Sequence, residues 1–279
     1  MDFGPTGRPL TEFPEPAPLA QHGPARIISL CNQKGGVGKT TTTISMGAAL
    51  AGYGRRVLAV DFDPQGALSA GLGVNSHDTP TIYDLLLNSK ADPHEAIVAT
   101  KVPGLDLIPA NIDLSAAEVH LVNEVAREQI LASVLRKVSQ DYDVILVDCQ
   151  PSLGLLTVNA LTASHGVLIP LECEFFALRG VALLIETIEK VRDRLNPAIV
   201  LDGILATMYD SRTLHSREVL ERVVDAFGDS VLETVIGRTV KFPDASVAGV
   251  PITEFAPEHQ AAKAYRQLAR ELVARGAVA

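Results

Sequence analysis

The sequence predicts an α/β fold: a single domain with a mostly parallel, twisted sheet flanked by helices on both faces. Two observations carry this prediction. From residue 26 onward, short runs rich in β-branched residues alternate with longer segments of helical periodicity, which is the pattern of parallel strands joined by crossover helices. A chain of 279 residues, 47% of them hydrophobic, is also long and apolar enough to fold around one large core.

Each expected element follows from one of two local patterns. Short apolar runs predict the strands, and apolar residues at helical spacing predict the helices. The strands are expected at 26–31, 56–61, 105–110, 143–148, 166–172, 199–208 and 230–236. The helices are expected at 39–53, 113–122, 127–140, 155–163, 177–195, 214–227 and 259–275.

Residues 1–24 differ from the rest of the chain. They hold many of the prolines and show no apolar periodicity. We therefore expect a disordered, proline-rich tail ahead of one domain at residues 25–279. The alternative is a segment that docks a partner through Phe3 or Phe13.

The composition narrows the classes of function. A formal net charge of −9 argues against a basic nucleic-acid binder, so any DNA contact must come from a local patch of cations. Cys31, Cys149 and Cys173 are far apart and form no Cys-x-x-Cys pair, which argues against a disulfide scaffold or a zinc site. With neither a signal-like N-terminus nor a run of about 18 apolar residues, the expected location is the cytoplasm.

A glycine-rich turn, NQKGGVGKT at residues 32–40, joins the first expected strand to the first expected helix. Such a turn offers free backbone N–H groups and the positive end of the helix dipole to phosphate groups. Lys39 would reach the β- and γ-phosphates, and Thr40 would bind Mg²⁺. Gln33 stands where the strict phosphate-loop pattern has a glycine, and a second lysine, Lys34, follows it. The sequence therefore predicts a nucleotide phosphate site with an additional lysine.

Carboxylates end two further expected strands, at the edge where an α/β sheet binds its ligands. In VDFDPQG, residues 60–66, Asp61 and Asp63 end the second strand, and Asp63 is placed to orient a water for attack on a γ-phosphate. The alternative is that both aspartates only cap a turn. In DVILVDCQP, residues 143–151, a buried strand delivers Asp148 as a magnesium ligand that acts through water.

With these motifs the chain resembles the ParA/MinD family of deviant Walker ATPases, and within it the ParA (Soj-like) proteins of chromosome and plasmid partition. The likeness spans about residues 26–275 and includes the blocks KGGVGKTTT, DFDPQG, DCQPSLGLLTVNALTAS and TMYDSRT. It implies a single-domain P-loop NTPase with ATP and Mg²⁺ as cofactors, slow hydrolysis without a partner, and a homodimer in the ATP-bound state. In that family the lysine at the position of Lys34 crosses the dimer interface to the phosphates bound by the other subunit.

The resemblance also implies a role for each residue of the site. Lys34, Lys39 and Asp63 would be catalytic, and Asp148 would hold the metal together with Thr40. Gly35, which is small, would let the other subunit approach closely. The residues expected to contact the nucleotide, with the last two near its base, are Lys34, Gly35, Gly36, Val37, Gly38, Lys39, Thr40, Thr41, Arg238 and Thr239.

By the same resemblance, the basic residues Arg212, Arg217 and Lys241 form a surface that binds DNA without sequence preference. ATP would close the dimer, hydrolysis would release it from DNA, and a ParB-like centromere-binding protein would accelerate the hydrolysis. The protein would then be associated with the nucleoid in its ATP-bound state. The alternative for the two arginines is pairing with Glu218 and Glu221 as a solvated face.

Other functions are consistent with parts of the sequence. The same ATP-dependent switch could position a protein complex without binding DNA. A scaffold could bind nucleotide without hydrolysing it, although Asp63 and Asp148 argue against this function. Membrane docking of the MinD type is disfavoured, because Tyr265, Leu268 and Leu272 are spaced to pack against the sheet.

Overall fold

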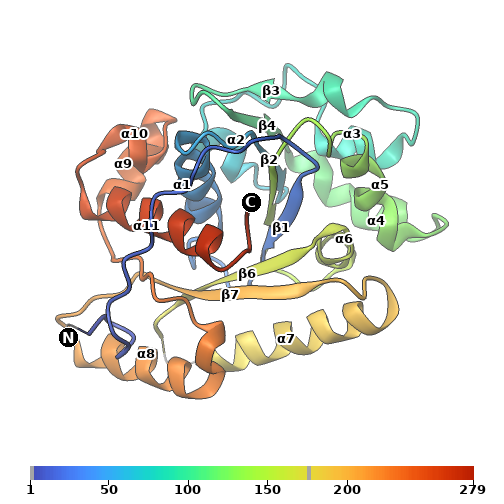
Figure 1. Cartoon of the computed structure of the whole chain (residues 1–279). Coiled ribbons are helices and arrows are strands. Elements are labelled where there is room, and N and C mark those ends of the chain that lie inside the picture. Colours follow the sequence, from blue (N-terminus) through green and yellow to red (C-terminus); the bar gives the residue numbers. More distant parts are fainter. Residues whose placement is uncertain (1–2, 175–176) are drawn as a thin grey trace.

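A mostly parallel sheet lies at the centre of the computed structural model, which describes residues 3–174 and 177–279 (Figure 1). Its strands are β1 (Arg26–Leu30), β2 (Val57–Phe62), β3 (Val98–Ala99), β4 (Leu105–Ile108), β5 (Val144–Cys149), β6 (Gly166–Glu172) and β7 (Val200–Thr207). Among the described residues these seven strands have the order β3-β4-β2-β5-β1-β6-β7. Only the short β3 runs antiparallel to its neighbour. The predicted fold class is confirmed.

Helices cover both faces of this sheet (Figure 1). The α-helices are α1 (Lys39–Gly52), α2 (Ala67–Gly71), α3 (Ile82–Leu87), α4 (Ala117–Leu121), α5 (Ile130–Arg136), α6 (Leu155–Ala163), α7 (Ala177–Arg194), α8 (Leu214–Phe227), α9 (Lys241–Ala248), α10 (Ile252–Phe255) and α11 (Gln260–Ala274). Four 3₁₀ helices among the described residues are η1 (Pro93–Ala96), η2 (Ile112–Ala116), η3 (Arg127–Gln129) and η4 (Gly228–Ser230).

The strand side chains alternate between two hydrophobic clusters, one on each face of the sheet. In β1, Ile27 belongs to the cluster that includes α6, and Ile28 belongs to the cluster that includes α1 and α11. This alternation follows from the pleat, in which successive side chains point to opposite faces. Because helices cover both faces, the sequences of the central strands are continuous apolar runs and do not alternate between apolar and polar residues.

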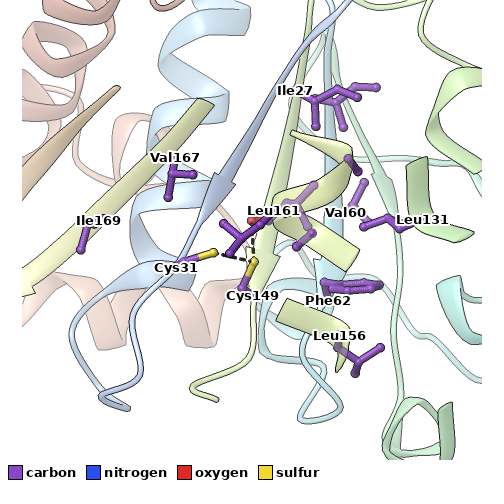
Figure 2. Packing of buried hydrophobic residues seen from close by; sticks show 14 of the residues in the cluster. Ile27, Cys31, Val60, Phe62, Leu131, Cys149, Leu156, Leu161, Val167 and Ile169 are labelled. Atoms are coloured by element: carbon purple, nitrogen blue, oxygen red, sulfur yellow. Dashed lines mark hydrogen bonds between the residues drawn. The ribbon is translucent and has the colours of Figure 1, made fainter. Parts of the chain in front are cut away.

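Figure 2 shows the cluster on the α6 side of the sheet. Ile27 and Val167, on neighbouring strands, belong to it together with Leu161 of α6. Cys31 and Cys149 point toward each other, with their Sγ atoms 3.1 Å apart. The cysteines are buried free thiols, and burial raises the pKa of the Cys149 thiol. The pair therefore packs as two small neutral side chains.

The prediction of a strand at 230–236 is wrong. The segment runs beside β7 and makes only isolated bridges to it, from Val231 to Ile204 and from Gly237 to Tyr209. Between these bridges the backbone N–H groups of Glu233 and Thr234 donate to the carboxylate of Glu271 in α11, each over 2.8 Å. The N–H groups of Leu232 and Ile236 bond to carbonyl groups of β7, but Glu271 takes the N–H of Thr234 between them, and the backbone ladder with β7 is interrupted there.

Several other elements differ from their predictions in length. The helix expected at 113–122 is divided into η2 and α4, and the helix expected at 127–140 is divided into η3 and a shorter α5. The sequence did not predict β3, α2, α3, α9 and α10, which have two to eight residues. Elements this short show too few repeats of either periodicity to stand out from loops.

Residues 3–24 follow an extended path over the surface, from β1 across α11 toward α8 (Figure 1). Glu15 accepts a hydrogen bond from Arg270 of α11 over 2.5 Å, and His22 Nδ1 lies 2.8 Å from an oxygen of Asp143. Residues 1 and 2 of the predicted tail lie outside the described residues. The disorder of residues 1–24 and the domain boundary at residue 25 stay predictions.

The C-terminal helix packs as its spacing predicted. Tyr265, Leu268 and Leu272 of α11 are at most 1% exposed, and the Tyr265 hydroxyl lies 3.1 Å from Thr42 Oγ1 in α1. No helix in the described part of the chain combines the length and the apolar composition that crossing a membrane would need.

The packing of α6 predicts a large stability difference between two leucines. Leu161, fully buried on α6, should lose about 2–5 kcal/mol of unfolding free energy on replacement by alanine, because a cavity remains in the core. Leu183→Ala on α7 is the matched control, since this leucine is 42% exposed and should cost only about 0.5 kcal/mol. Urea unfolding measures both, and equal losses would contradict the burial of Leu161.

Candidate active site

Three motifs that are far apart in the sequence meet at one edge of the sheet. β5 lies between β1 and β2, so its Asp148 is paired in register with Leu30 of β1 and with Asp61 of β2. The three strands are parallel, and their carboxyl ends therefore share this edge. The glycine-rich turn at 32–40 starts beside both acidic motifs.

The turn between β1 and α1 has the backbone of a phosphate-binding loop. Gly36 and Gly38 have φ angles of +77° and +86°, in the left-handed region that side chains with a Cβ rarely adopt. Gly38 is the N-cap of α1 and, among the described residues, no side chain caps the helix there. The first N–H groups of α1 can therefore bind an anion. The Lys39 ammonium group lies 3.2 Å from the Lys34 carbonyl oxygen, so this lysine curves back over the turn.

A hydroxyl and a carboxylate meet next to the turn at the position expected for Mg²⁺. Thr40 Oγ1 donates to Asp148 Oδ2 over 2.7 Å. Asp148 is 1% exposed, and burial together with the charge of Asp61 raises its pKa to about 8. Mg²⁺ fits this arrangement, because hydroxyl and carboxylate oxygens are among its preferred ligands and a cation would offset the repulsion between the buried acids.

The two aspartates of the second motif have different environments. Asp61 is buried and accepts hydrogen bonds from the backbone N–H and the hydroxyl of Ser69, over 2.8 and 2.7 Å, and burial raises its pKa to about 6. Asp63 is half-buried and accepts from the backbone N–H of Gln65 over 3.0 Å. Both aspartates therefore accept hydrogen bonds from the residues that follow β2, as expected if they only cap a turn. The role of Asp63 in hydrolysis stays a prediction.

Lys34 extends away from the turn toward the end of β6. Its ammonium group donates to Glu172 over 2.9 Å and to Glu174, and its side chain is 45% exposed. Partial burial lowers the pKa of Lys34, but the hydrogen bonds to both glutamates leave it raised. Glu172 also accepts from Arg238 over 3.1 Å. The sequence prediction missed both glutamates, although Glu172 ends an expected strand at this same edge.

A cavity of about 440 Å³ adjoins the turn on the side of α11. Phe242 and Tyr265 line it and meet edge to face, with ring centroids 5.9 Å apart. Aromatic walls beside a phosphate site suit a nucleotide base. Arg238 and Thr239 line this cavity together with Thr41, and their contact with the base stays a prediction. The two aromatic residues were not predicted. The lining residues are Gly38, Thr41, Thr207, Met208, Ile236, Arg238, Thr239, Phe242, Pro243, Ser246 and Tyr265.

The basic residues proposed for DNA lie outside this cavity, and two of them are paired with acids. Arg212 makes two hydrogen bonds to Asp210, over 2.9 and 2.8 Å, and lowers the pKa of that carboxyl to about 2. In the alternative interpretation the partners of the arginines are Glu218 and Glu221. Arg212 does form an ion pair, but its partner is Asp210, which is two residues away on the same turn. Lys241 lies 3.5 Å from Asp244, and Arg217 is exposed on α8.

The fold and the site define a P-loop ATPase, and comparison with known proteins agrees. The AAA_31 family model, described as an AAA domain, matches residues 25–201. An uncharacterized protein of Mycobacterium tuberculosis is 60% identical over 98% of this chain and 86% of its own length. The chromosome-partitioning ATPase Soj of Treponema pallidum is 49% identical over 90% of this chain and 98% of its own length. The chain belongs to the ParA/Soj family of partitioning ATPases.

A solved structure of similar sequence supports the assignment of the cofactors. Cobyrinic acid a,c-diamide synthase of Mycobacterium smegmatis is 43% identical, with a TM-score of 0.80 over 91% of this chain and 96% of its own. It was solved with ADP and magnesium and with an ATP analogue and magnesium. Soj is named as an ATPase and the synthase was solved with nucleotides, but the two names give different processes.

The contact between Thr40 and Asp148 predicts how magnesium strengthens nucleotide binding. Asp148→Asn keeps the shape of the side chain but removes its charge, so the gain in ADP affinity on adding Mg²⁺ should fall at least about tenfold. Calorimetry with and without Mg²⁺ measures this gain. Asp113→Asn, an exposed acid of η2, should leave it unchanged, and an unchanged gain in Asp148→Asn would remove the metal assignment.

Proposed function

We propose that this protein is an ATP-dependent dimerising ATPase of DNA partition. ATP with Mg²⁺ binds at the glycine-rich turn and closes a homodimer, the dimer binds DNA without sequence preference, and hydrolysis releases it. The names and bound ligands of the relatives support ATP, Mg²⁺ and hydrolysis. The stimulating partner would be a ParB-like centromere-binding protein, and the ATP-bound dimer would be associated with the nucleoid in the cytoplasm.

The orientation of Lys34 is the observation that carries the dimer. The ammonium group lies outside the turn, with Glu172 and Glu174, while Lys39 alone curves over the turn. A lysine that points away from its own phosphate site can reach a phosphate bound by a second copy of the chain. Gly35 supports such an approach, because nothing lies within 4 Å of the position that a Cβ would occupy there.

Charge balance makes this dimer depend on ATP. Two faces that each carry a triphosphate repel one another, and a lysine exchanged between the copies offsets the repulsion. Within one copy, Glu172 and Glu174 hold Lys34, so the exchange costs two ion pairs that a phosphate must replace. ADP lacks the γ-phosphate and therefore offers less compensation, which favours dissociation after hydrolysis.

Within one copy, different residues have different roles in hydrolysis. Lys39 and the N–H groups at the start of α1 bind the phosphates. Thr40 and Asp148, which lie within hydrogen-bond distance of each other, would hold Mg²⁺, which would supply positive charge to offset that of the phosphate oxygens. Asp63, half-buried at the end of β2, orients the attacking water.

Replacing the exchanged lysine should prevent dimerisation without preventing nucleotide binding. Lys34→Ala should raise the dissociation constant of the ATP-bound dimer at least about tenfold, because the repulsion between triphosphates is no longer offset. Sedimentation velocity in an Asp63→Ala background, where ATP should persist, measures the dimer. Lys190→Ala, an exposed lysine of α7, is the control. An ATP-dependent dimer of normal affinity in Lys34→Ala would exclude the exchange.

A rival function has one observation in its favour. Arg212 and Lys241 each lie against a carboxylate, Asp210 and Asp244, which reduces the positive potential available to DNA. The same switch would then position a protein complex. We favour DNA because Arg212 is 87% exposed in its ion pair, where such a pair is weak enough for phosphate to replace it, and because two copies double a weak patch.

DNA binding separates the two functions. A random-sequence duplex should bind only in the presence of ATP, and the affinity should fall as salt rises, because bound cations release counterions from DNA. Arg212→Ala should weaken this binding several-fold, about 1 kcal/mol per lost phosphate contact, and Arg194→Ala on α7 should not. Fluorescence anisotropy without nucleotide, with ADP and with ATP measures it. A dimer that binds no duplex under any of these conditions would favour the protein-positioning function.

A further inference from the structure

The N-terminal segment, residues 3–15, holds an arginine against the body of the domain. Phe3 and Pro9 form an antiparallel bridge, and Gly4 N donates to the Arg8 carbonyl over 2.8 Å, so residues 3–9 close into a small loop. From this loop the Arg8 guanidinium donates to the carbonyl oxygen of Val231 over 2.8 Å and to that of Gly228. The arginine is mostly buried, with 22% of its side chain exposed.

These two carbonyl groups belong to a stretch of backbone that is also held by side chains from α11 and from the residue that follows it. Arg275 donates to the carbonyl oxygen of Asp229 over 2.9 Å. Glu271 of α11, which is fully buried, accepts from the backbone N–H groups of Glu233 and Thr234. Isolated bridges and single backbone hydrogen bonds join this stretch to β7, so side chains share in holding its position, and Arg8 is the one supplied by the N-terminal segment.

The same stretch continues into the wall of the base cavity. Ile236 N donates to the Ala206 carbonyl over 2.9 Å and Arg238 N to the Tyr209 carbonyl over 3.0 Å, and Ile236, Arg238 and Thr239 then line the cavity. Arg238 and Thr239 also line a second groove, of about 320 Å³, together with Pro5 and Leu10 of the N-terminal segment. The segment therefore lies close to residues that form the wall of the base cavity.

We propose that Arg8 is a positioning residue for the nucleotide base. It fixes the carbonyl groups of Gly228 and Val231, and through them it sets where Ile236, Arg238 and Thr239 meet the base. The inference rests on the proposed function, in which ATP binds at the glycine-rich turn, and it adds that the cavity beside Phe242 and Tyr265 receives the adenine.

Steady-state ATPase assays and competition binding on the full chain test the positioning role. Arg8→Ala should raise the KM for ATP and the Kd for ADP about three- to tenfold, since two hydrogen bonds from a charged donor are lost, while kcat stays within about twofold. Binding of inorganic tripolyphosphate, which has no base, should be unchanged. Arg8→Lys, which can still donate to one carbonyl group, should restore part of the affinity for ADP. Glu15→Ala, which breaks only the contact to Arg270, should behave as wild type.

Phe242→Ala separates this inference from the proposed base cavity. If Phe242→Ala weakens ADP binding and Arg8→Ala does not, the cavity holds the base and the positioning role of Arg8 is wrong. If neither variant weakens ADP binding, the assignment of the cavity itself is wrong. A lower melting temperature in Arg8→Ala with normal ADP affinity would also overturn the inference, because the contact would then be structural. Equal weakening of ADP and tripolyphosphate would overturn it as well, because the effect would then not involve the base.

Discussion

The placement of β5 between β1 and β2 is the constraint on which the site depends. It buries Asp148 opposite both Leu30 and Asp61, and a buried carboxylate is costly unless it is hydrogen-bonded or paired with a cation. The hydroxyl of Thr40 supplies the hydrogen bond and thereby ties the first turn of α1 to the sheet. This contact, together with those of Asn32 to Pro170 and of Thr207 to Val37, fixes the glycine-rich turn, and it leaves a carboxylate where a divalent cation can offset the repulsion between the buried acids.

Two lysines five residues apart leave this turn in different directions, and the surrounding charges explain why. Lys39 lies inside, near the buried carboxylates, and is 7% exposed. Lys34 lies outside, where Glu172 and Glu174 hold it. The site therefore has an inner cation for its own phosphates and an outer cation in a replaceable ion pair. This separation is the physical basis of our proposal that nucleotide binding is connected to assembly.

The other side of the site is built differently. The wall of the base cavity comes from backbone that the sheet holds only at isolated points, and side chains from both ends of the chain, Arg8 and α11, complete the hydrogen bonds of this backbone. Side-chain contacts of this kind can be lost one at a time, whereas a backbone ladder is lost cooperatively. The phosphate side is thus held by the sheet, and the side of the cavity depends in addition on contacts between side chains and backbone.

The sequence by itself determined the parallel α/β class, six of the strands, the glycine-rich turn and the acids that end β2 and β5, because these features are encoded in local periodicity and in motifs of a few residues. Only the tertiary structure decided the strand order, the partners of Lys34, the aromatic wall formed by Phe242 and Tyr265, and the irregular course of residues 230–236. Each of these depends on groups far apart in the chain. Glu271 interrupts a strand 37 residues earlier by taking the N–H of Thr234, and no local pattern around 230–236 could reveal that competition.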